Sequence, residues 1–116
     1  MKKRNISKRI KDGYRYEQWC KWYLRMHGYH FVRLTKKSGD FGADIVCRSP
    51  ILLIKTVVQC KHYNHAVGVD AVQQIVAAKY PYHAHRAIVM TNSTYTRQAV
   101  KLAKECRVKL LWSKGR

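Results

Sequence analysis

The sequence predicts one α/β domain whose elements follow one another in the order αβββαβαβ. Two patterns support this prediction. Segments with apolar residues at helical spacing alternate with runs rich in β-branched and apolar residues. A length of 116 residues suits a single domain, and a hydrophobic content of 47% with few Pro and Gly residues indicates a packed globule.

The N-terminal half is expected to hold one helix and three strands. Apolar residues recur at helical spacing from Tyr16 to Met26, and Gly28 follows as a stop signal, so a helix is predicted over about residues 14–27. Residues 29–35, 43–48 and 54–63 have the aromatic and β-branched composition of strands. The sequence "SPIL" between the last two predicts a turn.

The C-terminal half is expected to alternate helices and strands. Apolar residues line one helical face from Val69 until Pro81 ends the pattern. "RAIVMT" is a continuous apolar run, which is typical of a buried strand. The hydroxyl side chains of "TNSTYT" offer N-caps to a third helix that reaches Cys106, and "VKLLW" is the last strand.

The charge of the chain predicts a polyanionic partner. There are 24 Lys and Arg residues but only 6 Asp and Glu residues, which gives a formal net charge of +18. Basic side chains that neutralise phosphates release counterions, so nucleic acid is the expected partner. Residues 1–12 are interpreted as a basic N-terminal arm ahead of one domain over residues 13–116.

Location and redox state follow from what the sequence lacks. No apolar run has the length of a secretory signal core or a membrane span, so a cytoplasmic protein without membrane contact is expected. The four cysteines have no CxxC spacing and are expected to be buried, reduced thiols.

A candidate metal site lies in the stretch "SGDFGADIVCRSPILLIKTVVQCKHY". Gln59 and Lys61 are two residues apart on a strand and share one face. A turn centred between Pro50 and Ile51 would place Asp44 opposite Val57 and diagonal to Gln59. The alternative is that Asp44 is an ordinary turn residue and that Gln59 and Lys61 form a solvated strand face.

Magnesium prefers hard oxygen ligands, which this stretch can supply. Asp44 would give a carboxylate, Gln59 an amide oxygen and Cys60 a backbone carbonyl. Lys61 is cationic, so its expected role is to orient or deprotonate the attacking water, or to stabilise charge that develops on a phosphate.

Five blocks of the sequence carry a family resemblance. "SGDFGADIV", "VVQCK", "VGVDAVQQI", "AIVMTNSTYT" and "AVKLAK" resemble, in this order, the Mrr-like restriction endonuclease catalytic domain of the PD-(D/E)xK nuclease superfamily. The resemblance implies a restriction-endonuclease-like mixed β-sheet flanked by helices. It also implies a phosphodiesterase that acts on DNA with Mg²⁺ or Mn²⁺.

Residue roles follow from the same resemblance. Asp44 matches the metal-binding Asp, and Gln59 and Lys61 match the QxK variant of the motif. Glu17 matches the acidic residue of the first helix that approaches the metal, and Asp40 matches the first Asp of the "GDxGxD" turn.

The helical positions give weaker indications. Glu17 falls at the border of the apolar stripe, although an i+4 pair with Lys21 is the alternative. Gln73 borders the buried face of its helix while Gln74 points away, so Gln73 is the expected site-lining amide. Among the aromatic residues of the first helix, which could stack unpaired bases, Tyr14 and Trp22 are expected to be the exposed ones.

The expected function is a metal-dependent DNA endonuclease of the Mrr or type IV restriction kind. A structure-specific nuclease similar to Holliday junction resolvases and a non-catalytic DNA-binding protein of the same fold are the alternatives. One such site breaks one phosphodiester, so paired-strand cutting predicts a homodimer.

Overall fold

The computed structural model describes residues 2–35 and 42–115, with side chains from residue 11 onward. The predicted order of elements is confirmed. The elements are α1 (Lys2–Met26), β1 (His30–Leu34), β2 (Ile45–Arg48), β3 (Lys55–Lys61), α2 (Val69–Ala78), β4 (Arg86–Thr91), α3 (Arg97–Cys106) and β5 (Val108–Trp112). Within the described part of the chain, no helix is both long and apolar enough to span a membrane.

The strands form one five-stranded sheet in the order β1-β2-β3-β4-β5. β1 pairs with β2 and β2 with β3 in antiparallel fashion, whereas β3, β4 and β5 run parallel to one another. Parallel neighbours need a crossover connection, and α2 and α3 provide it between these strands. The sheet is therefore mixed, as the family resemblance implied.

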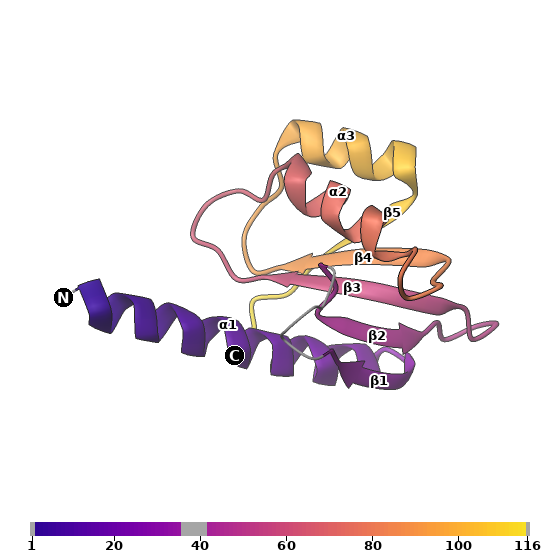
Figure 1. Cartoon of the computed structure of the whole chain (residues 1–116), viewed down its shortest axis with the longest axis horizontal. Helices are drawn as coiled ribbons and strands as arrows, with labels where there is room; N and C mark the ends of the chain where they lie inside the picture. Colours follow the sequence, from indigo (N-terminus) through magenta and orange to yellow (C-terminus); the bar gives the residue numbers. More distant parts are fainter. Residues whose placement is uncertain (1, 36–41, 116) are drawn as a thin grey trace.

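Helices cover both faces of this sheet (Figure 1). α2 and α3 pack on one face, where Val57 of β3 and Val89 of β4 meet Val72 and Ile75. α1 packs on the other face, and there its Leu24 belongs to the same cluster as Val58 of β3. Because β4 is buried on both sides, its sequence RAIVMT is a nearly continuous apolar run, and β3 is buried from Thr56 to Gln59 without alternation.

Helix α1 is longer than the sequence predicted. It begins at Lys2, so residues 2–12, expected as an arm, continue the helix. The residues before Gly13 are mostly good helix formers, and one glycine costs only about 1 kcal/mol in a helix interior. The buried stripe consists of Tyr16, Cys20 and Leu24, while Met26 is exposed.

The ends of the helices follow the predicted signals. Gly28 has a φ of +87° after the last turn of α1, a conformation that favours glycine. Thr96 is the N-cap of α3, and its hydroxyl oxygen accepts a hydrogen bond from the backbone N–H of Ala99 at 3.1 Å. In α2 the buried residues are Ala71, Val72, Ile75 and Ala78, whereas Val69 and Val76 are half-buried.

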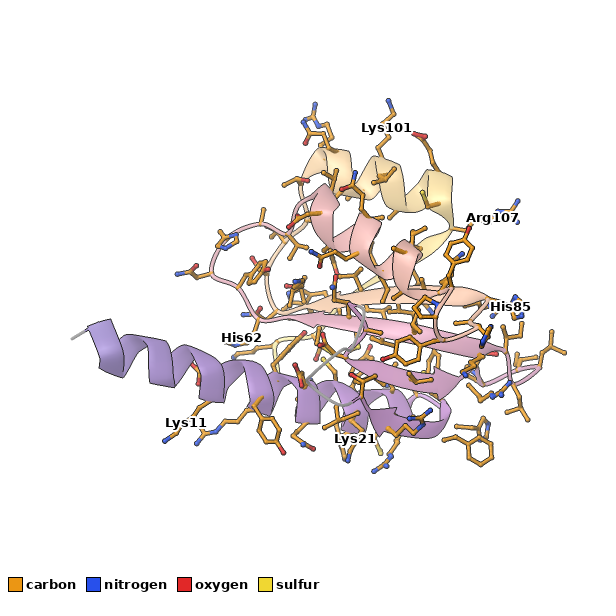
Figure 2. All side chains as sticks on the ribbon, viewed as in Figure 1. Lys11, Lys21, His62, His85, Lys101 and Arg107 are labelled. Atoms are coloured by element: carbon orange, nitrogen blue, oxygen red, sulfur yellow. The ribbon has the colours of Figure 1, made fainter. Side chains whose placement is uncertain are left out.

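Basic side chains cover the outer surfaces of the helices. Figure 2 shows Lys11 and Lys21 on the side of α1 that faces away from the sheet, and Lys101 on the outer side of α3. The basic side chains that the structure describes are all exposed or half-buried, so their charge lies on the surface of a folded domain.

The docking of α1 on the sheet should depend on Leu24. Its side chain is 0% exposed, so Leu24→Ala should lower the free energy of unfolding by about 2–5 kcal/mol through lost burial and a cavity. Met26 lies on the same helix and is 63% exposed, so Met26→Ala should change the free energy of unfolding by less than about 0.5 kcal/mol. Urea unfolding of both variants measures the difference; equal effects would contradict this packing.

Candidate active site

The register of β2 and β3 decides where Asp44 lies. Ile45 pairs with Val58 and Val46 with Val57, so Asp44, which precedes Ile45, lies level with Gln59. The prediction that Asp44 stands opposite Val57 was wrong by two residues. The connection is longer than the expected tight turn, because the Ser49 hydroxyl donates to Ile51 O at 2.6 Å and accepts from Ile54 N at 2.9 Å.

Asp44 is held by hydrogen bonds on both sides. Its carboxylate Oδ2 accepts from the backbone N–H of Cys60 at 2.8 Å, and its own N–H donates to Val58 O at 2.8 Å. On the other side its carbonyl accepts from Thr35 N at 2.9 Å. The carboxylate is therefore fixed against the C-terminal end of β3.

Gln59 is buried at this corner and joins three segments. Its side chain is 3% exposed, and Nε2 donates to Gly42 O at 3.0 Å and to Gln74 Oε1 of α2 at 2.8 Å. These two bonds fix the orientation of the amide. The opposite atom, Oε1, is a buried side-chain oxygen with no hydrogen-bond partner in the described structure.

A close approach explains the glycine at position 42. Its φ is +87°, and a Cβ there would lie 3.3 Å from Gln74 O. The turn before β2 therefore packs closely against α2, and in this position Gly42 O accepts a hydrogen bond from Gln59 Nε2. A larger residue would be strained in conformation and crowded in space.

The carboxylates of Asp44 and Glu17 both act on the thiol of Cys60. Burial raises the pKa of the Cys60 thiol well above its ordinary value, and Cys20 and then the negative charges of Asp44 and Glu17 raise it further. The thiol is therefore neutral at physiological pH. Glu17 comes from α1 and Asp44 precedes β2, so two different elements supply negative charge that acts on this thiol.

Lys61 ends β3 on the same face as Gln59, because side chains alternate along a strand. Its carbonyl accepts a hydrogen bond from the Thr91 hydroxyl at 2.7 Å, which ties this end of β3 to β4. Its Nζ lies 5.7 Å from the centre of the Tyr63 ring, within the range of a cation–π contact.

Two further residues, Asp40 and Gln73, were predicted to line the site. Asp40 lies outside the described residues. Gln73 was the expected site-lining amide of α2, but Gln74 is the one that bonds Gln59, so the preference for Gln73 was wrong. The signal was present in the sequence: Gln74 follows Ala71 by three residues and precedes Ala78 by four, which places it beside two buried positions.

The donors at this corner are of mixed kind. Within the described residues, no three His, Cys, Asp or Glu side chains form a group that could hold a metal ion. The oxygens available here are the Asp44 carboxylate on the Cys60 N–H and the buried amide oxygen of Gln59, which lies level with Asp44 on the next strand. Hard oxygen ligands of this kind suit Mg²⁺ or Mn²⁺, and the unpartnered Oε1 of Gln59 fits a cation better than it fits an apolar core.

The fold resembles that of several solved proteins, one of which is a restriction endonuclease. AspBHI, a DNA modification-dependent restriction endonuclease, has a TM-score of 0.65 and 22% identity over 84% of this chain and 27% of its own. A protein of unknown function, AF1548, has a TM-score of 0.66 and 17% identity over 84% of this chain and 58% of its own. EndoMS in complex with double-stranded DNA has a TM-score of 0.60 and 16% identity over 77% of this chain and 38% of its own.

This chain spans less than two thirds of each of these solved proteins. No curated protein sequence matches it. The family comparison is more specific, since the model of the Mrr catalytic domain, described as a restriction endonuclease, matches residues 9–115. That match covers almost the whole fold and the corner built by Asp44, Gln59 and Lys61, and the chain belongs to the Mrr-type restriction endonuclease family.

Proposed function

We propose that this chain is a metal-dependent DNA endonuclease that hydrolyses phosphodiester bonds, with a role of the Mrr or type IV restriction kind. The observation that carries the proposal is the corner at the end of β3. There the Asp44 carboxylate is fixed on Cys60 N, and the buried oxygen of Gln59 has no hydrogen-bond partner in the described structure. Buried polar atoms are almost always satisfied, and a bound cation would satisfy this one.

Mg²⁺ or Mn²⁺ is the proposed cofactor. Asp44, Gln59 and the backbone carbonyl of Cys60 would hold it, with Glu17 approaching from α1. Such an ion polarises a phosphoryl oxygen and lowers the pKa of bound water. Asp44 and Gln59 are already held in place by hydrogen bonds from or to the backbone, so little ordering would accompany binding.

The other residues act on the phosphate and the water. Lys61 follows Gln59 on the same strand face, and its ammonium group would orient the attacking water or stabilise negative charge on the phosphate. The +18 charge draws DNA toward the domain and holds it mainly through its phosphates. One of the similar structures, that of EndoMS, is a complex with double-stranded DNA.

Removing the charge of Asp44 should separate cleavage from binding. Asn keeps an oxygen for the bond to Cys60 N but is a weaker metal ligand, so Asp44→Asn should lower the rate of plasmid nicking by about 10³-fold or more. DNA affinity in chelator should stay equal or rise, because one negative charge near the phosphate is lost. Nicking of supercoiled plasmid and fluorescence anisotropy measure the two quantities.

Two companion variants sharpen this test. Lys61→Ala should abolish nicking while weakening affinity only slightly, whereas Asp70→Asn, at an exposed acid of α2, should leave both unchanged. Full metal-dependent nicking by a folded Asp44→Asn protein would refute the assigned site. Running the same assay on a four-way junction distinguishes a junction resolvase, and the absence of nicking by the wild-type protein indicates a DNA-binding role alone.

Gln74 should act as a positioning residue through Gln59. Gln74→Ala removes one of the two acceptors that orient the Gln59 amide, so it should lower nicking about ten-fold and raise the Mg²⁺ concentration needed for half-maximal rate. Gln73→Ala, at the neighbouring exposed position, is the matched control and should change neither quantity. A rate loss without any change in Mg²⁺ dependence would count against this role.

The chain is also proposed to work as a homodimer when it cuts both strands, because one site breaks one phosphodiester. Light scattering of the protein bound to DNA should then give the mass of two chains, and linear plasmid should accumulate after nicked plasmid. A monomer that nevertheless produces linear plasmid in a single binding event would rule out this explanation.

A further inference from the structure

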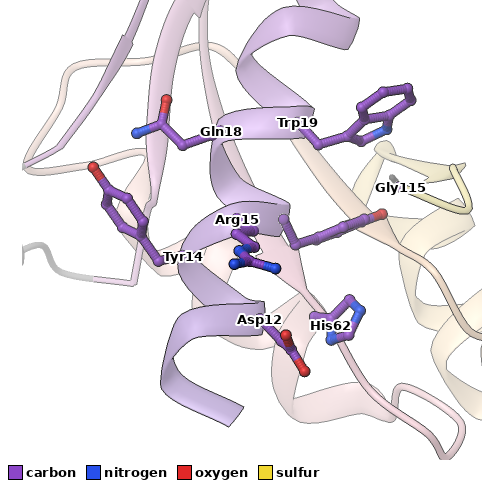
Figure 3. Close-up of a pocket in the computed structure, with 8 residues that line it drawn as sticks. Asp12, Tyr14, Arg15, Gln18, Trp19, His62 and Gly115 are labelled. Carbon is purple, nitrogen blue, oxygen red and sulfur yellow. The ribbon is translucent and has the colours of Figure 1, made fainter. Parts of the chain in front are cut away.

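A pocket lies on the α1 side of the sheet, away from the face that carries Gln59. It has a volume of about 540 Å³ and is bounded by residues 12–19 in the middle of α1, by His62 just after β3 and by Gly115 near the C-terminus (Figure 3). This volume lies within the range of pockets that hold small molecules. None of the roles proposed above uses it.

Aromatic rings form its walls, and hydrogen bonds hold them in place. The Tyr16 hydroxyl donates to Ser113 O at 3.0 Å, and Trp19 Nε1 donates to Ser113 Oγ at 2.6 Å. The Tyr16 ring lies 5.4 Å from the His62 ring at an interplanar angle of 49°. Both α1 aromatics are thereby anchored to the segment after β5, so their positions do not depend on a ligand.

Glycine at position 115 keeps the tail close to this wall. A Cβ on Gly115 would lie 3.0 Å from Cδ1 of Tyr16, and the residue has a φ of +82°. The tail can therefore run directly against the Tyr16 ring, which is only 3% exposed, and Gly115 closes one side of the pocket.

Polar groups complete the pocket at its other end. In Figure 3, Asp12, Arg15 and His62 lie near one another, while Trp19 marks the opposite end, and Tyr14 and Gln18 point to the other side of the helix. A carboxylate, a guanidinium group and an imidazole supply both donors and acceptors. Flat apolar walls with donors and acceptors at one end match the faces and the edge of a nucleobase.

The pocket is close to the proposed cleavage site along the chain. His62 directly follows Lys61 and is two residues beyond Cys60, whose N–H holds the Asp44 carboxylate. Two extended residues span about 7 Å, or roughly two nucleotide steps of a DNA strand at 3.4 Å each. A strand whose phosphate lies at Asp44 would thus bring a neighbouring base to His62.

We propose that this pocket binds an unpaired nucleobase of DNA, between Trp19 and the exposed His62, whose ring rests on the buried Tyr16, within about two nucleotides of the scissile bond. The position relative to the bond rests on the proposed nuclease function, but base binding itself does not. A base stacked in an intact duplex cannot enter the pocket, so the preferred substrate carries a bulged, mismatched or single-stranded nucleotide.

Binding in the presence of chelator tests the pocket without cleavage. The probes are a duplex with a single bulged 2-aminopurine and the same duplex fully paired. The wild-type protein should bind the bulged duplex about ten-fold more tightly and quench its fluorescence, because base–aromatic stacking strengthens binding and quenches this base. His62→Ala and Trp19→Leu should each reduce that preference to about two-fold or less and diminish the quenching.

Tyr80→Ala is the matched control, since Tyr80 is a 79% exposed aromatic just beyond α2 and outside the pocket. It should keep the full preference for the bulged duplex. His62 is exposed, so His62→Ala decides the matter even where Trp19→Leu unfolds the protein. Equal wild-type affinity for both duplexes, or an unchanged preference in folded His62→Ala, would overturn the proposal. Loss of nicking in Asp44→Asn has no bearing on these readouts.

Discussion

Strand β3 is packed by helices on both faces, and this constraint organises the rest of the molecule. Its residues alternate between two interiors: Val57 and Gln59 face α2 and α3, whereas Val58 and Cys60 face α1. The alternation continues past the end of the strand, so that Lys61 belongs to the side of the proposed metal site and His62 contacts Tyr16 of α1. Adjacent residues of one short strand therefore serve two different surfaces.

Burial on both faces also explains why polar groups on β3 are tightly bonded. A buried amide without partners costs free energy, and Gln59 avoids most of that cost through Gly42 O and Gln74 Oε1. A lone carboxylate in such surroundings would be costly as well, and Asp44, which is only half-buried, accepts a hydrogen bond from the backbone N–H of Cys60 near the end of the strand. The Oε1 atom of Gln59 is the exception, because it has no hydrogen-bond partner in the described structure, and it is the proposed metal ligand.

Much of the fold could be predicted from the sequence because its signals are local. Apolar periodicity separated helices from strands, and Gly28 and Thr96 marked helix ends correctly. The length of α1 was missed because Gly13 and a run of basic residues read as an arm, although neither breaks a helix.

The geometry of the candidate site depends on pairings that local patterns do not determine. The β2–β3 register follows from hydrogen bonds of Ser49 within the connecting turn, which is longer than "SPIL" suggested. Local patterns were also insufficient for α2. The apolar stripe of this helix favoured Gln73 as the site-lining amide, whereas the buried Gln59 side chain donates to Gln74. Asp44 and Gln59 lie on neighbouring strands, in another register than predicted, and the roles of Asp44, Gln59 and Lys61 stay predictions.

The three-way link of Gly42, Gln59 and Gln74 has a consequence for folding. It joins a turn, a central strand and a crossover helix that are far apart in sequence, and the parallel pairs that support it close only after long loops have formed. Structures dominated by such distant pairings fold slowly, typically in milliseconds to seconds. The β2–β3 hairpin contains Gly42, Asp44 and Gln59, but Gln74 lies on α2, so the corner is complete only when this crossover helix docks on the sheet.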